Sequence, residues 1–437
     1  MKKQIEKIIY EFFINSNDFN GIPLRQVSRV LKLNYKLSID LIKSLVVDDI
    51  VSIQSSTNPH IIGFQHYPID IQVKILEDAK NHKVTYHKMG KIRLATESTE
   101  FPICLYPSVN YLKVNRDLTS FKNAEYIKQL ALAEPQLKPI FFEIEVLERY
   151  FNDPRFDFDF NDYSGQISCK YDENNNPIVR EEDQIFLKTF GLGFDSEGNR
   201  LAVVYLRYLK DLTSEHQIYW KSKEAKGECK MLKEYHENTI AGSWVFSQSI
   251  FSAFLSELNC LNELSKTIFG KNLFLKSFEN NKQPKEFTFF FIPTTKNYYE
   301  FIGLLDKMIS DNINKDFFNG HVELFELKQL SENMVERVQK GTLRLFEEWL
   351  LEQYKSKQQE IIKKIFKPFK DIRKERQKPA HRINENEYDK KYIEKQREII
   401  SQAYSSMRAF REIFQQHPKA QKFDISNWIN EGEIKNF

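Results

Sequence analysis

Apolar and polar positions alternate with a helical period over the first fifty residues. Apolar residues recur at three- and four-residue steps over 5–13, 24–31 and 39–45. A short run with β-like composition follows, Ile50–Gln54. We therefore predict three helices and a strand, which together form an N-terminal domain over residues 1–57.

The pattern from residue 58 to residue 292 is mixed. It predicts helices over 126–133 and 198–212, the second with a turn and N-cap at Asp195–Asn199. Phe156–Phe160 alternates Phe with Asp, which predicts an edge strand with solvated acids. Glu286–Ile292 has the composition of a buried strand. These segments predict a central mixed α+β domain, whose role the pattern does not indicate.

The composition shifts at Pro293, where we place a third domain, 293–437. An amphipathic helix is expected over 297–313 and a β-hairpin over 322–339. Two long helices follow, one from Leu343 and one from about Tyr388 to His417. The predicted fold class is a multidomain α+β protein that ends in a helical bundle with a β-hairpin insertion.

Composition narrows the classes of function. The 437 residues include 64 Lys+Arg and 61 Asp+Glu, so a nucleic-acid surface must come from local clustering of cations. The four cysteines are scattered without a C-x-x-C pair, which excludes a disulfide framework and a structural zinc site. No apolar run approaches the roughly 20 residues of a membrane span and no signal peptide is evident, so we expect a cytoplasmic protein.

Cations gather on one face of the first long C-terminal helix, opposite an apolar face. This pattern fits a nucleic-acid surface and fits an ordinary solvated face equally well. The cations concerned are Lys355, Lys357, Lys363, Lys364, Lys367, Lys370, Arg373 and Lys374.

Arg376 and His381 lie where this helix meets the last one. Residues five apart on a continuous helix are about 140° apart around the axis, so the two would not share a face. Pro379 breaks the helix, and His381 can then turn back toward Arg376. A His that transfers protons near neutral pH and a fixed Arg cation are what cleavage of an RNA phosphodiester without metal requires.

The sequence from Arg376-Gln377 to Ala380-His381 resembles the R-x4-6-H signature of the HEPN-domain ribonucleases, and the resemblance covers roughly residues 293–437. It implies attack by the RNA 2′-OH, with no metal or other cofactor. It also implies a homodimer in which two protomers complete one site, in a toxin or antiviral defence effector held off until a regulatory partner or phage trigger acts. Arg376 and His381 would be catalytic, and the neighbouring residues Arg373, Lys374, Gln377, Lys378 and Arg382 would bind the RNA.

The N-terminal domain resembles a winged helix-turn-helix, with residues 36–47 as the recognition helix. The resemblance places Lys36, Ser38 and Lys43 in a DNA major groove and Arg25 or Arg29 on a phosphate. The alternative is a module for dimerisation or protein contact, because Asp40, Asp48 and Asp49 repel phosphate.

Two other functions stay open at this point. One is a DNA-binding regulator whose HEPN-like dimer is catalytically inactive, and the other is an RNA-binding scaffold. A second Arg-His match, Arg411 to His417, is interpreted as structural, with His417 capping the last helix. A Mg²⁺ or Ca²⁺ site is the alternative to the edge strand for the acids Asp153, Asp157, Asp159 and Asp162.

Overall fold

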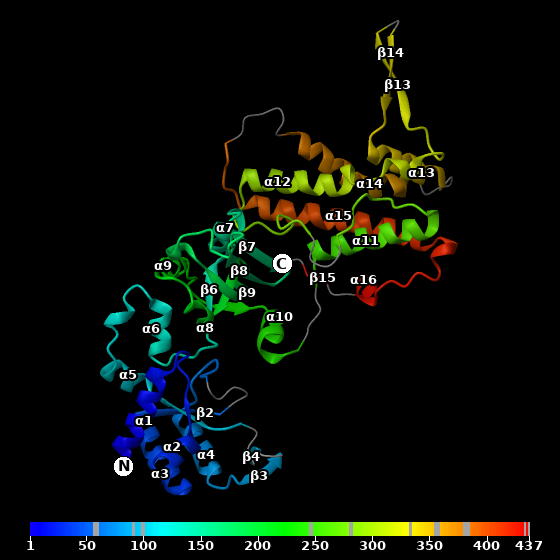
Figure 1. The fold of residues 1–437 in the computed structure, drawn as a ribbon. Coiled ribbons are helices and arrows are strands. Elements are labelled where there is room, and N and C mark those ends of the chain that lie inside the picture. The colour runs from blue at the N-terminus through cyan, green and yellow to red at the C-terminus, as the bar shows by residue number, and fades with distance from the viewer. Residues whose placement is uncertain are drawn as a thin grey trace. The chain divides into compact units, whose positions relative to one another are not determined.

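The computed structural model describes residues 1–55, 61–89, 92–97, 101–243, 248–278, 283–331, 334–353, 359–378, 385–431 and 434–435. The chain is a mixed α+β protein with several small sheets, as predicted. It divides into two compact units (Figure 1). The first contains Met1–Phe158 and Gly165–Met231, and the second contains Asp159–Ser164 and Leu232–Phe437.

The first unit begins with three helices packed against a small sheet, which confirms the predicted N-terminal elements. The sheet is antiparallel with strand order β1-β5-β2. Ile5, Ile39, Ile42 and Leu105 are fully buried between helices and sheet. The elements are α1 (Lys2–Asn15), β1 (Ile22–Pro23), α2 (Leu24–Val30), α3 (Tyr35–Val47), β2 (Val51–Gln54) and β5 (Cys104–Pro107).

The described residues between β2 and β5 form one helix and one hairpin. Helix α4 (Ile69–Ala79) packs along α3, and β3 (Val84–Met89) pairs antiparallel with β4 (Ile92–Glu97). The run at Ile61–Phe64, which is β-like in sequence, is not a strand, although Ile61 and Ile62 are buried.

A larger sheet, most of which belongs to the first unit, has the strand order β6-β10-β9-β8-β7, and β11 pairs with β9. The edge strand predicted at Phe156–Phe160 is confirmed, because β7 ends this order and Phe156 is buried while Asp157 and Asp159 are exposed. The strands are β6 (Pro139–Glu143), β7 (Phe156–Asn161), β8 (Ser164–Cys169), β9 (Phe186–Asp195), β10 (Arg200–Tyr205) and β11 (Cys229–Met231). The helices are α5 (Val109–Asn115), α6 (Glu125–Ala131), α7 (Glu148–Asn152), α8 (Leu206–Leu209) and α9 (Ser214–Ser222).

The helix predicted over 198–212 is wrong. The turn at Asp195–Asn199 is present, but it connects β9 to β10, and only Leu206–Leu209 is helical. All six residues of β10 are buried, because both neighbouring positions in the sheet are occupied and its faces are covered. A continuous apolar run of this kind has no period that separates a central strand from a buried helix.

The second unit is mainly a helical bundle, in which α15 packs against α11 and α14. The apolar face of α15 is buried within the chain, and Phe410 contacts Phe346, Phe366 and Phe369. The long elements are α11 (Ile250–Phe269), α12 (Thr295–Asp306), β13 (Phe325–Ser331), β14 (Met334–Gln339), α13 (Thr342–Gln353), α14 (Gln359–Gln377) and α15 (Lys391–Gln415). The short ones are α10 (Lys233–His236), β12 (Gln248–Ser249), α16 (Asn427–Glu431) and β15 (Ile434–Lys435).

The strand predicted at Glu286–Ile292 is also wrong. The segment has no regular structure, although its aromatic rings are buried and Phe287 packs against Phe251 and Phe301. The boundary predicted at Pro293 lies inside the second unit, because α11 precedes that residue in sequence and packs with α15. None of the described helices is both long and apolar enough to cross a membrane.

Candidate functional site

The predicted site begins at the C-terminal end of α14. This helix ends at Gln377 and α15 starts at Lys391, so Arg376 lies where one long helix gives way to the next. His381 and Arg382 fall outside the described residues. The structure therefore gives the position of the predicted catalytic Arg and not that of the predicted catalytic His.

Arg376 is held by two aspartates. Its Nη1 donates to Asp306 Oδ2 at 2.5 Å and to Asp311 Oδ2 at 3.0 Å. Arg373, one turn earlier, donates from Nη1 to the same two carboxylates, at 3.2 Å in each case. These four residues, Asp306, Asp311, Arg373 and Arg376, are called the Arg376 cluster below.

Asp306 anchors the cluster. It is the last residue of α12, its side chain has no exposed surface, and it also accepts a hydrogen bond from Ser310 Oγ at 2.6 Å. A buried carboxylate is stable only where cations and donors replace its lost hydration. Arg373 and Arg376 supply that replacement, so the requirements of Asp306 fix the orientation of both guanidinium groups.

The cluster is electrically balanced but partly open. The hydrogen bond to Asp306, followed by that to Asp311, raises the pKa of Arg376. Burial opposes ionisation of Asp311, but the bonds from Arg376 and Arg373 lower its pKa. About a third of the Arg376 side chain, 35%, is exposed, and among the described residues its Nε and Nη2 atoms have no hydrogen bond. These N–H groups are therefore directed donors that an anion from solvent can reach.

The other cations predicted near Arg376 are exposed. Lys374 lies on the solvent side of α14, and Gln377 is the exposed last residue of the helix. Lys378 forms an ion pair with Glu375, which raises the pKa of the Lys378 ammonium. None of these three joins the Arg376 cluster within the part of the chain that the structure describes.

The predicted DNA contacts on α3 are only partly available. Lys36 is exposed, but Lys43 forms an ion pair with Glu77 of α4, and Asp40 forms one with Lys80 at 2.6 Å. Ser38 is buried and donates its hydroxyl to Asn34 O at 3.1 Å, so the prediction that Ser38 faces a groove is wrong. These two ion pairs connect charged side chains of α3 to α4.

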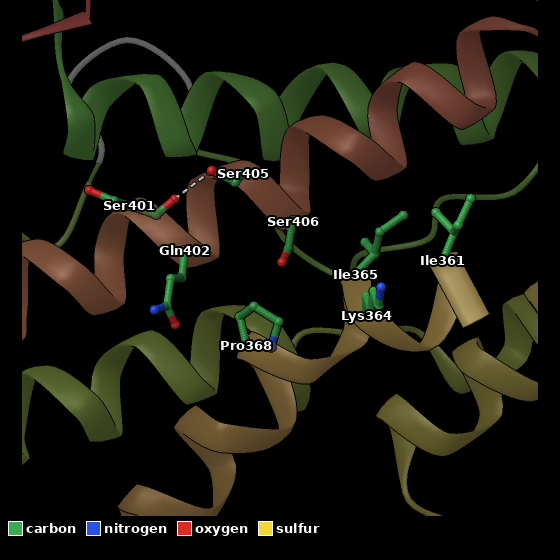
Figure 2. Close-up of a pocket in the computed structure, with 8 residues that line it drawn as sticks. All are labelled: Ile361, Lys364, Ile365, Pro368, Ser401, Gln402, Ser405 and Ser406. Carbon is green, nitrogen blue, oxygen red and sulfur yellow. Dashed lines mark hydrogen bonds between the residues drawn. The ribbon is translucent and has the colours of Figure 1, made fainter. Parts of the chain in front are cut away.

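A groove of about 400 Å³ lies between α14 and α15 (Figure 2). Ile361, Ile365 and Pro368 line one side, and Ser401 and Ser405 belong to the other. Pro368 has no N–H, so the carbonyl of Lys364 cannot receive the usual helical hydrogen bond there. The groove offers apolar contact and hydroxyl groups but, apart from Lys364, no charged group, so it suits binding better than proton transfer.

The second Arg-His match is structural. Arg411 is 1% exposed and forms a two-bond ion pair with Glu257 of α11. His417 does not cap α15 as predicted, because its Nδ1 accepts a hydrogen bond from the N–H of Lys419 at 3.2 Å. It therefore caps the following turn, Pro418–Ala420.

The acids considered as a cation site are dispersed. Asp153 is bound by Arg155, Asp157 lies 3.7 Å from Lys170, and Asp162 accepts from Ser252. Within the described ranges no group of three His, Cys, Asp or Glu side chains could hold a metal ion.

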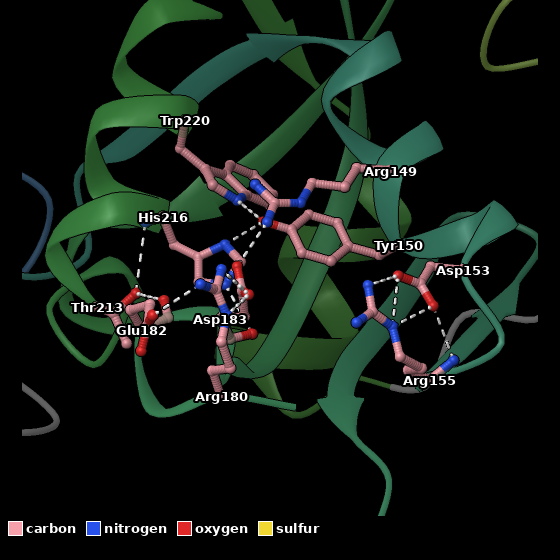
Figure 3. A network of polar contacts seen from close by, with 10 residues as sticks. All are labelled: Arg149, Tyr150, Asp153, Arg155, Arg180, Glu182, Asp183, Thr213, His216 and Trp220. Atoms are coloured by element: carbon pink, nitrogen blue, oxygen red, sulfur yellow. Dashed lines mark hydrogen bonds and ion pairs between the residues drawn. The ribbon is translucent and has the colours of Figure 1, made fainter. Parts of the chain in front are cut away.

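A polar network surrounds His216 in the first unit (Figure 3). Trp220 Nε1 donates to the Tyr150 hydroxyl at 3.0 Å, and that hydroxyl lies 2.6 Å from His216 Nδ1. His216 Nε2 lies 3.0 Å from the carbonyl of Asp183, which can only accept. Nε2 therefore carries the proton and Nδ1 accepts from Tyr150. Burial lowers the pKa of His216, so this network contains a neutral histidine with a structural role.

Asp306 and Asp311 are the site residues that the sequence prediction missed. Ile302, Leu305 and Ile309 mark the apolar face of this helical segment, and Asp306 falls among them. An acid on an apolar helix face signals a buried carboxylate and thus a cation partner.

Comparisons with protein-family models, with curated proteins and with solved structures found no match to this chain.

Proposed function

We propose that the chain is a metal-independent endoribonuclease of the HEPN type, with Arg376 and His381 as its catalytic residues. The observation that carries the proposal is the Arg376 cluster. It supplies a guanidinium that a buried carboxylate orients and that keeps donors open to solvent, at the junction between α14 and α15. His381 follows Arg376 by five residues in the sequence.

The chemistry follows from these residue types. Arg376 would donate N–H groups to the non-bridging oxygens of the scissile phosphate and stabilise the charge that develops there. His381 would transfer the proton of the attacking 2′-OH or of the leaving 5′-oxygen. DNA lacks the 2′-OH and would resist. As the resemblance to the HEPN family implies, a second copy would complete the site, and a toxin or antiviral defence role is part of this proposal.

Cleavage of labelled RNA by the full chain tests this proposal. Wild type, Arg376→Ala, His381→Ala and Arg408→Ala are compared with and without EDTA. Arg408 is a suitable control because it is an Arg of the same bundle that pairs with Glu412 on α15, away from the Arg376 cluster. Cleavage that survives EDTA and is lost only in the first two variants supports the proposal. Equal activity in all four proteins contradicts it.

An effector that needs a trigger would be inactive in that assay, so a cellular measurement accompanies it. Overexpression of wild type is expected to arrest growth and degrade cellular RNA, whereas Arg376→Ala is not. Intact RNA and equal growth for both proteins would contradict the proposal.

The second candidate is a DNA-binding regulator with a catalytically inactive bundle. The three helices α1–α3 against the β1-β5-β2 sheet and the exposed Lys36 support a winged-helix module. The ion pairs from α4 to Lys43 and Asp40 weigh against DNA binding through α3. Tight binding of duplex DNA that Lys36→Glu abolishes, together with intact RNA, would favour the regulator.

A further inference from the structure

The β13–β14 hairpin projects from the α13 end of the bundle (Figure 1). Within the described residues, the hydrogen bond and ion pair that attach it to the rest of the second unit lie at its base. Lys315 Nζ donates to Gln339 Oε1 at 2.9 Å, and Arg344 forms an ion pair with Glu326. Lys340 N–H donates to Leu324 O at 2.9 Å and joins the two ends of the hairpin. The outer part consists of exposed residues on both strands.

Large apolar side chains are exposed on this hairpin. Leu327 is 76% exposed, Met334 60%, Val335 58% and Leu330 54%. Scattered apolar residues on a surface are ordinary, but four on one short projecting hairpin are a concentration that indicates an interaction site.

The hairpin also has free strand edges. Among the described strands, β13 and β14 pair only with each other. An isolated two-stranded hairpin is marginally stable in water, and its outer N–H and C=O groups are a template for another strand. A third strand would stabilise the hairpin and would also pair with these N–H and C=O groups.

The two faces of the hairpin differ. The strand register places Leu327 opposite Arg337 and Gln329 opposite Val335 on one face, where Arg337 also lies 4.2 Å above the ring of Phe325. The other face carries charges, with Lys328 opposite Glu336. Along β13 itself the sequence Glu326-Leu327-Lys328 puts an acid and a base on either side of an exposed leucine.

We propose that the free edge of β13 pairs antiparallel with β13 of a second copy, about a two-fold axis at Leu327. In that register Glu326 lies opposite Lys328 of the second copy, and Lys328 lies opposite Glu326 of the second copy. The two Leu327 side chains meet at the axis. The result is a four-stranded sheet whose interface is isologous and closes after two chains.

The charges select a second copy as the occupant. Opposite charges directly across an antiparallel pair stabilise it, and like charges destabilise it. If two copies paired through β14 instead, a two-fold axis at Glu336 or at Arg337 would place like charges opposite each other. RNA fits the hairpin poorly, because Glu326 and Glu336 balance Lys328 and Arg337. Glu326 can join the new pair since its bond to Arg344 uses Oε2 alone.

This proposal does not rest on the nuclease proposal. Pairing through β13 is one association step, separate from any contact between copies at the Arg376 cluster. The mass of the full chain in solution, measured by size exclusion with light scattering over a series of concentrations, reports that step directly.

Lys328→Glu should halve the mass, because it places acids opposite acids across the axis. Glu336→Lys is the matched control: it also puts like charges across the Lys328–Glu336 pair inside the hairpin, but it leaves the β13 edge unchanged. It should keep the wild-type mass. Circular dichroism checks that both variants are folded.

Mixing two variants provides a second, independent test. Glu326→Lys alone should also halve the mass, and an equimolar mixture of Glu326→Lys with Lys328→Glu should restore it, since every facing pair is then of opposite sign. A wild-type mass equal to that of Lys328→Glu would overturn the proposal. So would an equal loss in Glu336→Lys, or a mixture that stays at half mass.

Discussion

Arg411 of α15 and Glu257 of α11 form an ion pair in the interior of the second unit. The Nε–Oε2 distance is 2.8 Å and the Nη2–Oε1 distance is 3.1 Å, and the two side chains are 1% and 2% exposed. The two residues are 154 positions apart in the sequence, and the helices that carry them pack along each other.

Removing one partner of this pair should be costly. Arg411→Ala leaves the Glu257 carboxylate buried without its cation, and we expect a loss of about 3–5 kcal/mol in the free energy of unfolding. Urea denaturation of the full chain measures it. Arg408→Ala, which breaks a solvent-exposed pair on the same helix, should cost less than about 1 kcal/mol. Replacing both partners, Arg411→Met with Glu257→Leu, should recover most of the loss. Equal effects of the two single variants would show that the pair is not a main support of the bundle.

Stability should depend on pH through His216. Because burial lowers the pKa of this His, the folded state binds fewer protons than the unfolded state. Its contribution is therefore fully present above the unfolded pKa, about 6.5, and is lost as the pH falls toward the folded pKa. Urea denaturation should show decreasing stability from pH 7 to pH 5, and His216→Gln should reduce that slope. An unchanged slope in the variant would refute the assignment.

Tyr150→Phe tests the same network at constant pH. The variant leaves His216 Nδ1 and Trp220 Nε1 without their partner, and we expect a loss of about 1–3 kcal/mol at pH 8. A loss below about 0.5 kcal/mol would mean that water or a neighbouring group replaces the hydroxyl.

Asp306 is expected to act as a positioning residue for Arg376. Asp306→Asn keeps the size of the side chain but removes the charge that orients the guanidinium. RNA cleavage should fall by about 10²-fold, because misplacement of a catalytic group by about 1 Å has that effect. The dissociation constant for RNA should change little. Asp371→Asn, an exposed change on α14, serves as control. A variant that loses RNA affinity and cleavage in equal proportion would indicate a binding role instead.

The helical parts of the fold were the most predictable from sequence. Their apolar faces are periodic, so α1, α3, α12 and α15 appear close to the expected positions. The β13–β14 hairpin was also predicted, because its turn is polar and both strands are short and β-like. These signals are local in the sequence.

The errors arose where burial is complete. Strand β10 and the coil around Phe287 are both continuous apolar runs, and such runs report burial without reporting the conformation. Their structures depend on partners distant in sequence: β6 and β9 for the strand, and Phe251 and Phe301 for Phe287.

For a similar reason, only part of the candidate site could be predicted from the sequence. Arg376 was found through a short motif, but its partners lie 70 and 65 residues earlier and no local pattern connects them. The same motif at Arg411 and His417 is structural, and only the buried partner Glu257 distinguishes the two matches. Lys43 was likewise predicted to contact DNA, because no local pattern shows that Glu77 of α4 pairs with it.

The ends that cleavage leaves on the RNA report on the proposed mechanism. Full-length protein is incubated in EDTA with an RNA oligonucleotide and with the same oligonucleotide carrying one 2′-deoxy position at the cleavage site. The proposed mechanism predicts a 2′,3′-cyclic phosphate and a 5′-OH from the first, no cleavage at the modified position of the second, and neither product with Arg376→Ala or His381→Ala. Cleavage at the 2′-deoxy position, or wild-type rates in both variants, would contradict it.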